Sequence, residues 1–263
     1  MFLALDVGNT NVTVGLFNME SAKVLPNPLK VWRMSTIKRH TSDEYAMVLM
    51  NMFSYSGFDV KKVRYVAIAS VILSSNFIFE ELIKKYFKKD VFFVNYENSG
   101  DLVFAVANFK KVGADRIANA VGAYSIYGGE CIVVDFGTTT TFDCLNSKGE
   151  YIGGAIVPGL IISLEALRLR TDQLPQIEIR RPLKSIGTDT VKCIQSGIYF
   201  GYIGLVKEIL TRMKKEIKVK HVIATGGLSE FISCEINEID AILPNLTLEG
   251  IRIAWNKNHR RKC

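Results

Sequence analysis

Cysteine and histidine are scarce in this chain of 263 residues, and neither forms a recognisable pattern. The five cysteines are odd in number, and no Cys-x-x-Cys pair occurs. This spacing argues against a disulfide framework and against a structural zinc site. The three histidines stand far apart, so they predict neither a metal cluster nor a catalytic triad. We therefore expect a protein of the reducing cytoplasm.

Long hydrophobic runs are also absent. The longest uncharged stretches, 65–79 and 151–164, are shorter than the roughly 20 residues that a membrane-spanning helix needs. No basic region opens the chain, and an acidic residue follows the first five, so we expect no signal peptide. The sequence thus predicts no membrane partner.

The composition, with 48% hydrophobic and 22% charged residues, is that of a folded chain with one large or two smaller domains. The net charge of +7 weakly favours an anionic partner. The basic residues fall in short local runs without interleaved aromatic residues. Such runs are more typical of solvated helix faces than of a nucleic-acid-binding surface, so we expect no nucleic acid partner.

The predicted elements occur in the same order in both halves. The first half gives strands 2–5, 11–17 and 30–36, helix 41–55, strand 63–71, helix 74–89 and strand 91–94. The second gives strands 131–134, 140–145 and 151–156, helices 159–170 and 189–217, strand 221–225 and helix 246–257. Helix 115–127 joins them. We interpret the chain as two copies of one unit and predict domains 1–114 and 115–263.

Each copy carries the motif D-x-G-x-T between its first two strands, at 6–10 and at 135–139. A tight hairpin of this kind directs several backbone N–H groups into one space, which suits phosphate, and Asp6 can hold a Mg²⁺-bound water. A single D-x-G turn is common and needs no functional explanation. Two copies in equivalent positions favour two loops that hold one polyphosphate across a cleft.

Two further segments are weaker signals. Gly113-Ala114-Asp115-Arg116 opens the joining helix. It fits either an ordinary helix start or a general base beside an arginine that binds a carboxylate. Segment 221–229 runs from a strand through Gly226-Gly227, which lets a flat base lie on the backbone, although an ordinary strand–helix turn explains it better. No Walker P-loop and no protein-kinase H-R-D motif occurs.

These motifs belong to a longer series that lies in register along the chain. The series is D-x-G-N-T-N at 6–11, G-A-D-R-I-A-N-A-V-G-A at 113–123, V-D-F-G-T-T-T-T-F-D at 134–143, G-G-A-I-x-P-G at 153–159, R-T-x-x-L-P at 170–175, I-G-x-x-T-V at 186–191, Q-S-G-I-x-x-G-Y at 195–202, T-G-G-L at 225–228 and N-L-T-L-E-G at 245–250. With them the chain resembles the type III pantothenate kinases of the acetate and sugar kinase, Hsp70 and actin superfamily.

The resemblance implies an α/β fold of duplicated RNase H-like, actin-like ATPase domains with a nucleotide cleft between them. It implies transfer of the γ-phosphoryl group of ATP to the 4′-hydroxyl of pantothenate, the first step of coenzyme A synthesis. Mg²⁺ and a monovalent cation, K⁺ or NH₄⁺, are the implied cofactors. A homodimer is the implied assembly. Glycines 197, 201 and 204 on the long helix would allow close helix packing, within the chain or between chains.

The same resemblance implies roles for single residues. Asp115 matches the catalytic base, and Asp135 matches the ligand of the monovalent cation. The pantothenate contacts are matched by Gly113, Ala114, Asp115, Arg116 and Thr190. The ATP contacts are matched by Asp6, Val7, Gly8, Asn9, Thr10, Asn11, Val12, Thr13 and Thr138. One departure stands out, because Val106 occupies the position where members often carry a tyrosine that contacts pantothenate.

Two alternatives remain open from the sequence. The chain could be another small-molecule kinase of the same superfamily, which a substrate panel would reveal. It could also be a non-catalytic, regulatory relative. The intact Asp6, Asp115, Arg116 and Asp135 argue against that second alternative, because a decayed site should have lost some of them.

Overall fold

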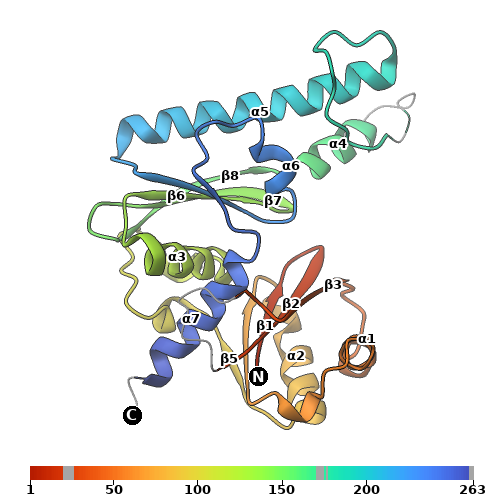
Figure 1. The fold of residues 1–263 in the computed structure, drawn as a ribbon, viewed down its shortest axis with the longest axis vertical. Helices are drawn as coiled ribbons and strands as arrows, with labels where there is room; N and C mark the ends of the chain where they lie inside the picture. The colour runs from red at the N-terminus through yellow and green to blue at the C-terminus, as the bar shows by residue number, and fades with distance from the viewer. Residues whose placement is uncertain (20–26, 170–174, 176, 261–263) are drawn as a thin grey trace. The chain divides into compact units, whose positions relative to one another are not determined.

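The computed structural model describes residues 1–19, 27–169, 175 and 177–260 (Figure 1). Segment 170–174 of the R-T-x-x-L-P motif lies outside the described residues. Within the described ranges, no helix combines the length and hydrophobicity that a membrane-spanning segment requires. The chain divides into two compact units. The first comprises Met1–Gly128, Gly149–Tyr151 and Asn245–Cys263, and the second comprises Gly129–Lys148 and Ile152–Pro244.

The first unit is built on a five-stranded mixed sheet. Its strand order is β3-β2-β1-β4-β5, with bounds β1 (Phe2–Val7), β2 (Asn11–Phe17), β3 (Lys30–Ser35), β4 (Tyr65–Ser70) and β5 (Val91–Phe93). The first three strands are antiparallel, and β1, β4 and β5 are parallel. The predicted hairpin and the predicted strands of this half are therefore confirmed, with small shifts at their ends.

Helices cover both faces of this sheet because successive side chains of β1 point to opposite sides. Leu3 and Leu5 share one core with the buried residues of α1 (Ser42–Tyr55) and α2 (Asn76–Leu82). On the other face, Phe2 packs against Trp255 of α7 (Leu246–Arg260), with ring centroids 5.3 Å apart. The predicted helix 74–89 is instead a 3₁₀ turn (Leu73–Ser75), α2 and a π-helical segment (Ile83–Phe87), which Lys88 ends with φ of 55°.

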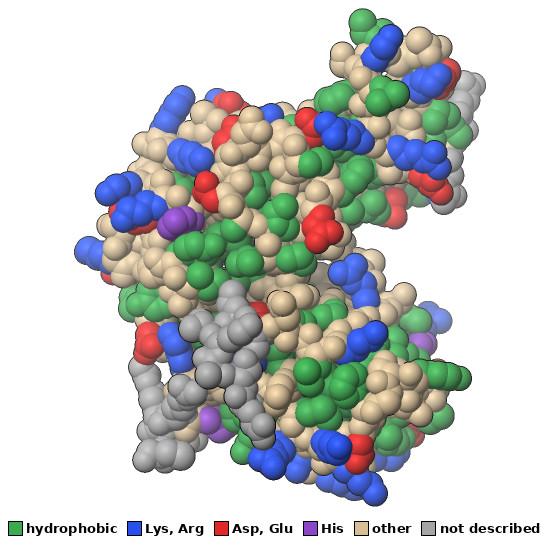
Figure 2. Space-filling view, in the orientation of Figure 1, with side chains coloured by type: hydrophobic (Ala, Val, Ile, Leu, Met, Phe, Trp, Pro, Cys, Tyr) green, Lys and Arg blue, Asp and Glu red, His purple; other side chains and the backbone are tan. Residues whose placement is uncertain are grey.

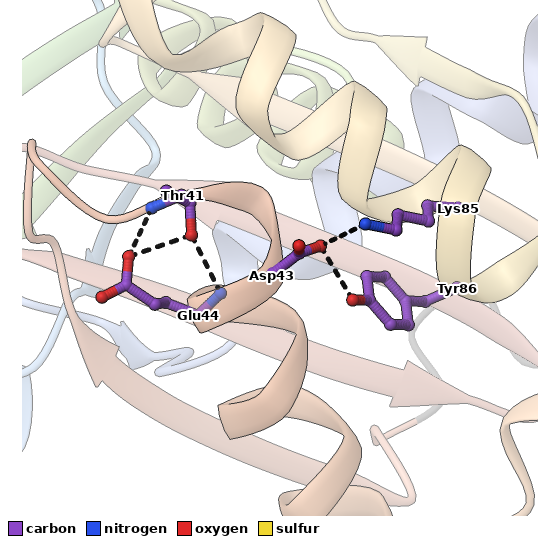
Figure 3. A network of polar contacts seen from close by, with 5 residues as sticks. All are labelled: Thr41, Asp43, Glu44, Lys85 and Tyr86. Carbon is purple, nitrogen blue, oxygen red and sulfur yellow. Dashed lines mark hydrogen bonds and ion pairs between the residues drawn. The ribbon is translucent and has the colours of Figure 1, made fainter.

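The first turn of α1 is fixed by polar contacts (Figure 3). Thr41 Oγ1 accepts from Glu44 N and the Glu44 carboxylate accepts from Thr41 N, which is the predicted capping box. Asp43 accepts from Lys85 Nζ at 2.7 Å and from Tyr86 Oη at 2.8 Å. The hydrogen bond from Lys85 is the main reason that the pKa of Asp43 is lowered. These contacts tie α1 to the segment that follows α2.

The second unit repeats the first. Its sheet has the order β10-β9-β6-β7-β8, with bounds β6 (Cys131–Phe136), β7 (Thr139–Leu145), β8 (Tyr151–Pro158), β9 (His221–Thr225) and β10 (Ala241–Ile242). Strands β6, β7, β8, β9 and β10 thus take the places of β1, β2, β3, β4 and β5. Buried residues of the long helix α5 (Thr190–Glu216) cover one face of the sheet. The predicted duplicated α/β fold is confirmed. The short β10 and the helix α6 (Ser229–Ser233) were not predicted as separate elements, although a helix start was expected near residue 229.

The compact units differ from the boundary predicted between residues 114 and 115. Helix α3 (Ala114–Tyr127) and helix α7 both pack in the first unit, although they follow the first repeat in the chain. They approach closely: a Cβ on Gly250 would overlap the Ala118 carbonyl, and one on Gly122 would meet Leu246. The sequence repeat and the spatial units therefore divide the chain at different places.

Candidate functional site

The two D-x-G-x-T loops occupy equivalent positions in the two units. Asp6 lies near the carboxyl end of β1 and Asp135 near the carboxyl end of β6, and both side chains are half-buried. The last two residues of each D-x-G-x-T motif, 9–10 and 138–139, are exposed. The same sequence pattern thus gives the same exposure twice.

Hydrogen bonds hold the first loop in a fixed shape. Gly8 N donates to Asn11 O at 3.0 Å, and Thr36 N donates to Thr10 O at 2.9 Å. The Thr36 hydroxyl donates to Gly8 O at 2.7 Å. These contacts fix the backbone of a tight turn, the kind of turn whose N–H groups can bind an anion.

The second loop is held in a parallel manner. Gly159 N donates to Thr138 O at 3.1 Å, and Gly159 follows β8 as Thr36 follows β3. A Cβ on Gly159 would come within 2.6 Å of the Gly137 carbonyl oxygen, so this contact requires glycine. Leu228 N donates to Phe136 O at 3.2 Å, as Val71 N donates to Val7 O at 3.1 Å in the first unit.

Asp115 lies in the first turn of α3, with Gly113 as the N-cap residue. Its Oδ1 accepts from Arg116 N at 2.8 Å, and a Cβ on Gly113 would lie 2.5 Å from that same oxygen. The same Cβ would lie 3.7 Å from the Val71 side chain, and Val71 also donates to Val7 of the first loop. Gly113 and Val71 therefore connect the first turn of α3 to the first D-x-G-x-T loop.

The surroundings of Asp115 favour its protonated form. Burial raises the pKa of this carboxyl above its ordinary value of 3.8, against the opposing effects of the Arg116 N–H group and the Arg116 charge. A carboxylate with a raised pKa is a better proton acceptor than an exposed one. The raised pKa is consistent with the expectation that Asp115 acts as a base.

Arg116 lies beside an aromatic wall. Its guanidinium group is 5.9 Å from the ring centroid of Tyr151, which is 1% exposed. Tyr151 forms an isolated bridge with Phe104, and their rings lie 5.5 Å apart. Val106, at the position of the departure from the family pattern, follows Phe104 by two residues and is half-buried. The wall therefore keeps aromatic rings although the usual tyrosine is absent.

Asp135 offers one carboxylate for a cation. Among the described residues, no group of three or more histidine, cysteine, aspartate or glutamate side chains that could hold a metal ion occurs. A carboxylate combined with neutral oxygen donors would fit a monovalent ion better than a transition metal. A single carboxylate at Asp6 also fits Mg²⁺, which usually enters such sites with its phosphates and several waters.

Thr190 is the first residue of α5 and is exposed, and Asp189 caps that helix by accepting from Lys192 N at 2.8 Å. Thr138 and Asp135 lie in the second unit with Thr190, whereas the first loop and Asp115 lie in the first unit. The residues that support the first loop, Thr36 and Val71, were not predicted, and no local signal marks them. Gly159, which supports the second loop, could have been found from the sequence because it ends the G-G-A-I-x-P-G motif.

The lysine and arginine side chains on the face drawn in Figure 2 are interspersed with acidic and neutral groups. They form no continuous basic stripe there.

Comparisons with known proteins agree with the geometry. The family model of type III pantothenate kinase matches residues 2–212. A type III pantothenate kinase of Endomicrobium trichonymphae is 63% identical over 257 residues, which cover 98% of this chain and 99% of that relative. One from Geobacter sulfurreducens is 44% identical over 259 residues, covering 98% and 99%.

Two solved structures share the fold at low identity. A conserved putative Baf family transcriptional activator from Campylobacter jejuni has a TM-score of 0.61 at 19% identity, covering 98% of this chain and 99% of that one. A putative 2-dehydro-3-deoxygalactonokinase from Sinorhizobium meliloti has a TM-score of 0.61 at 11% identity, covering 99% and 96%. These two neighbours share the α/β fold of the chain, with its two five-stranded mixed sheets. By the family model and the full-length relatives, the chain belongs to the type III pantothenate kinase family.

Proposed function

We propose that this chain transfers the γ-phosphoryl group of ATP to the 4′-hydroxyl of pantothenate, with Asp115 as the general base. Family membership supports the reaction. The observation that carries the assignment of the base is the position of Asp115 beside the first loop, through Gly113 and Val71.

The bond changes need little covalent participation from the protein. The pantothenate hydroxyl oxygen forms a bond to the γ-phosphorus, and the bond from that phosphorus to the β,γ-bridging oxygen breaks. The hydroxyl proton passes to the Asp115 carboxylate. Because the proton leaves late in a loose transition state, the first task of Asp115 is to orient the hydroxyl group.

The remaining site residues bind the two anionic substrates. We assign the phosphates of ATP to the loop Asp6–Thr13 and to Thr138, because the two loops carry the same D-x-G-x-T motif and the same pattern of exposure. Arg116 is suited to the pantothenate carboxylate, since its guanidinium group can form two parallel hydrogen bonds. Gly113, Ala114 and Thr190 are the further pantothenate contacts in this proposal.

Two cations complete the assignment. Mg²⁺ would enter with ATP near Asp6, and K⁺ or NH₄⁺ would bind at Asp135. When bound, they neutralise charge on the phosphates, while the protein residues supply the oxygen atoms that hold them. On this assignment, Asp135→Asn abolishes activation by K⁺, and an unchanged dependence on K⁺ would remove Asp135 as the ligand.

We also propose a cytoplasmic homodimer that uses the open face of α5. A Cβ on Gly197, Gly201 or Gly204 would meet no atom within 4 Å, and Leu205 on the same face is 36% exposed. Small residues at these helical positions allow close approach of another helix. A second copy of the chain is the occupant that the family resemblance implies.

The central test is ADP release from Mg-ATP by the purified protein, with and without pantothenate, in K⁺ or in Na⁺. We expect release that depends on pantothenate and needs K⁺. Asp115→Asn should lose most of this activity while still binding ATP in calorimetry, and the exposed Asp90→Asn serves as the matched control.

Wild-type turnover in Asp115→Asn would reject that residue as the base. Release with another alcohol but not with pantothenate would favour a different small-molecule kinase. ATP binding without any release would favour a regulatory relative.

The dimer has its own test. Gly201→Glu has room in the single chain and improves helix propensity, so it should leave the fold intact. We expect light scattering to give twice the chain mass for the wild type and the single mass for the variant. A variant that stays dimeric would exclude this face as the interface.

A further inference from the structure

We propose that the Thr225 hydroxyl oxygen is a second ligand of the monovalent cation at Asp135, with the Thr141 hydroxyl oxygen beside it. The inference rests on the proposed role of Asp135 as the cation ligand. It concerns residues of the second unit only.

The register of the sheet places these three side chains in one row. Asp135 of β6 is opposite Thr141 of β7 and opposite Thr225 of β9. Paired residues on neighbouring strands point to the same face and stand about 4.8 Å apart. The adjacent residues Val134, Phe142 and Ala224 point to the opposite face and belong to the core under α5. The row therefore lies on the face of the sheet that is turned away from α5.

The Thr225 hydroxyl has no hydrogen-bond partner among the described residues, although Thr225 is 0% exposed. A buried hydroxyl without a partner is unfavourable unless a ligand supplies one. A few other buried polar atoms share this condition, Ser233 Oγ among them. Only Thr225 of these lies directly opposite a predicted cation ligand.

The residue after Thr225 brings its backbone onto the carboxylate. Gly226 has φ of +89°, and a Cβ there would overlap Asp135 Oδ1. The absence of that side chain lets the Asp135 carboxylate rest on the backbone directly after Thr225. The carboxylate and the hydroxyl group therefore border the same small space.

Thr141 adds a neutral oxygen atom on the opposite side. It is 6% exposed, and its Oγ1 donates to Asp143 Oδ2 at 3.2 Å. With its proton committed to that buried carboxylate, the oxygen keeps lone pairs for another partner. One carboxylate and two hydroxyl oxygen atoms form a donor set that suits an alkali cation.

The first repeat supplies an internal comparison. Asp6 is opposite Thr13 of β2, as Asp135 is opposite Thr141. On the parallel neighbour, however, Asp6 is opposite Ala69, which has no side-chain oxygen atom. The third donor therefore exists only in the second copy, and this difference gives a reason for the cation to bind at Asp135.

The test compares Thr225→Val, Thr225→Ser and the wild type by thermal unfolding in KCl, NaCl and choline chloride at equal ionic strength. Each series is run with and without Mg-ADP, and Asp135→Asn is included. The matched control is Ser233→Ala, which removes another unpartnered hydroxyl of the same unit. This readout measures cation binding by its effect on stability and does not depend on turnover.

We expect Thr225→Val to need about 10-fold more K⁺, or more, for half of the K⁺-specific rise in Tm. In choline it should unfold at the wild-type temperature or above, because an unpartnered hydroxyl has been removed. Thr225→Ser should respond as the wild type does, and Ser233→Ala should keep the full response to K⁺.

A wild-type response in Thr225→Val, with the response lost in Asp135→Asn, would overturn this inference and leave the role of Asp135 intact. A wild-type response in both variants, or none in the wild type, would reject the cation assignment as well.

Discussion

Glu249 on α7 is a buried carboxyl group whose charge should destabilise the protein at neutral pH. It is 4% exposed, and its Oε2 accepts from Arg252 Nε at 3.1 Å. Burial nevertheless raises the pKa of Glu249 to about 7, against the opposing charge of Arg252. We therefore predict that Glu249→Gln stabilises the protein above neutral pH.

The magnitude follows from the two pKa values. One pKa unit corresponds to about 1.4 kcal/mol, so a rise from the ordinary 4.5 to about 7 gives a ceiling of about 3 kcal/mol. The folded state holds the proton more tightly than the unfolded chain. Its contribution to stability is therefore full below pH 4.5 and is lost as the pH rises to about 7. The pKa of about 7 already includes the attraction of Arg252, so no separate energy is added for the ion pair.

Tryptophan fluorescence in urea is the suitable assay. Both tryptophans, Trp32 and Trp255, lie in the first unit together with Glu249, so their signal reports the unfolding of that unit. The free energy of unfolding should be measured for the wild type and for Glu249→Gln from pH 4.5 to pH 8. We expect the variant to gain up to about 3 kcal/mol at pH 8 and nothing at the acid end.

The opposite sign at pH 8 would refute the reasoning, because it would mean that the ion pair with Arg252 outweighs the cost of burial. A difference that does not change with pH would refute it equally. Glu80→Gln is the control, since Glu80 forms an exposed pair with Lys84 in the same unit. Such an exposed pair should contribute little to stability.

Three further predictions concern the same unit. Asp115→Asn should raise the stability of the first unit at neutral pH, because burial raises the pKa of Asp115. The variant should lose this advantage as the pH falls toward 3.8, which urea unfolding at several pH values checks. Gly250→Ala should cost about 1–3 kcal/mol or more in the same assay, since its Cβ would overlap the Ala118 carbonyl, and unchanged stability would contradict the close packing of α3 and α7. Val106→Tyr should lower KM for pantothenate several-fold and leave KM for ATP unchanged. Steady-state kinetics measures both constants, and an equal effect on both would contradict a role of this position in binding pantothenate.

The parts of the fold that local chemistry determines could be predicted from the sequence. Strand β9 was predicted with its correct ends from an apolar run followed by two glycines. The start of α1 was predicted from the Thr41 and Glu44 capping box. Both signals lie within a few residues of the element that they mark. The repeat could be predicted for the same reason, since each copy carries its own turn motif.

Long-range packing was not predictable in this way. Helix α7 completes the first unit by packing on β1, although the two elements stand near opposite ends of the sequence. No local sequence pattern indicates this contact. The break of the predicted helix 74–89 into three kinds of helical turn has a similar origin. Phe79, Leu82 and Ile83 of this segment are buried in the core of the first unit, and such long-range contacts are not visible in the local sequence.

In the candidate site, the loops could be predicted from a local motif, whereas the register of the strands could not. The motif D-x-G-x-T predicted two similar loops, and the structure gives both the same exposure and equivalent supporting hydrogen bonds. Only the pairing of the strands reveals that Ala69 and Thr225 occupy corresponding positions beside Asp6 and Asp135. On the proposal above, the Thr225 hydroxyl group, which the first copy lacks, is the reason that the monovalent cation binds at Asp135. Ala69→Thr therefore tests whether that hydroxyl suffices, since Thr13 already stands opposite Asp6. A second K⁺-dependent rise in Tm would show that it does, and an unchanged response would show that it does not.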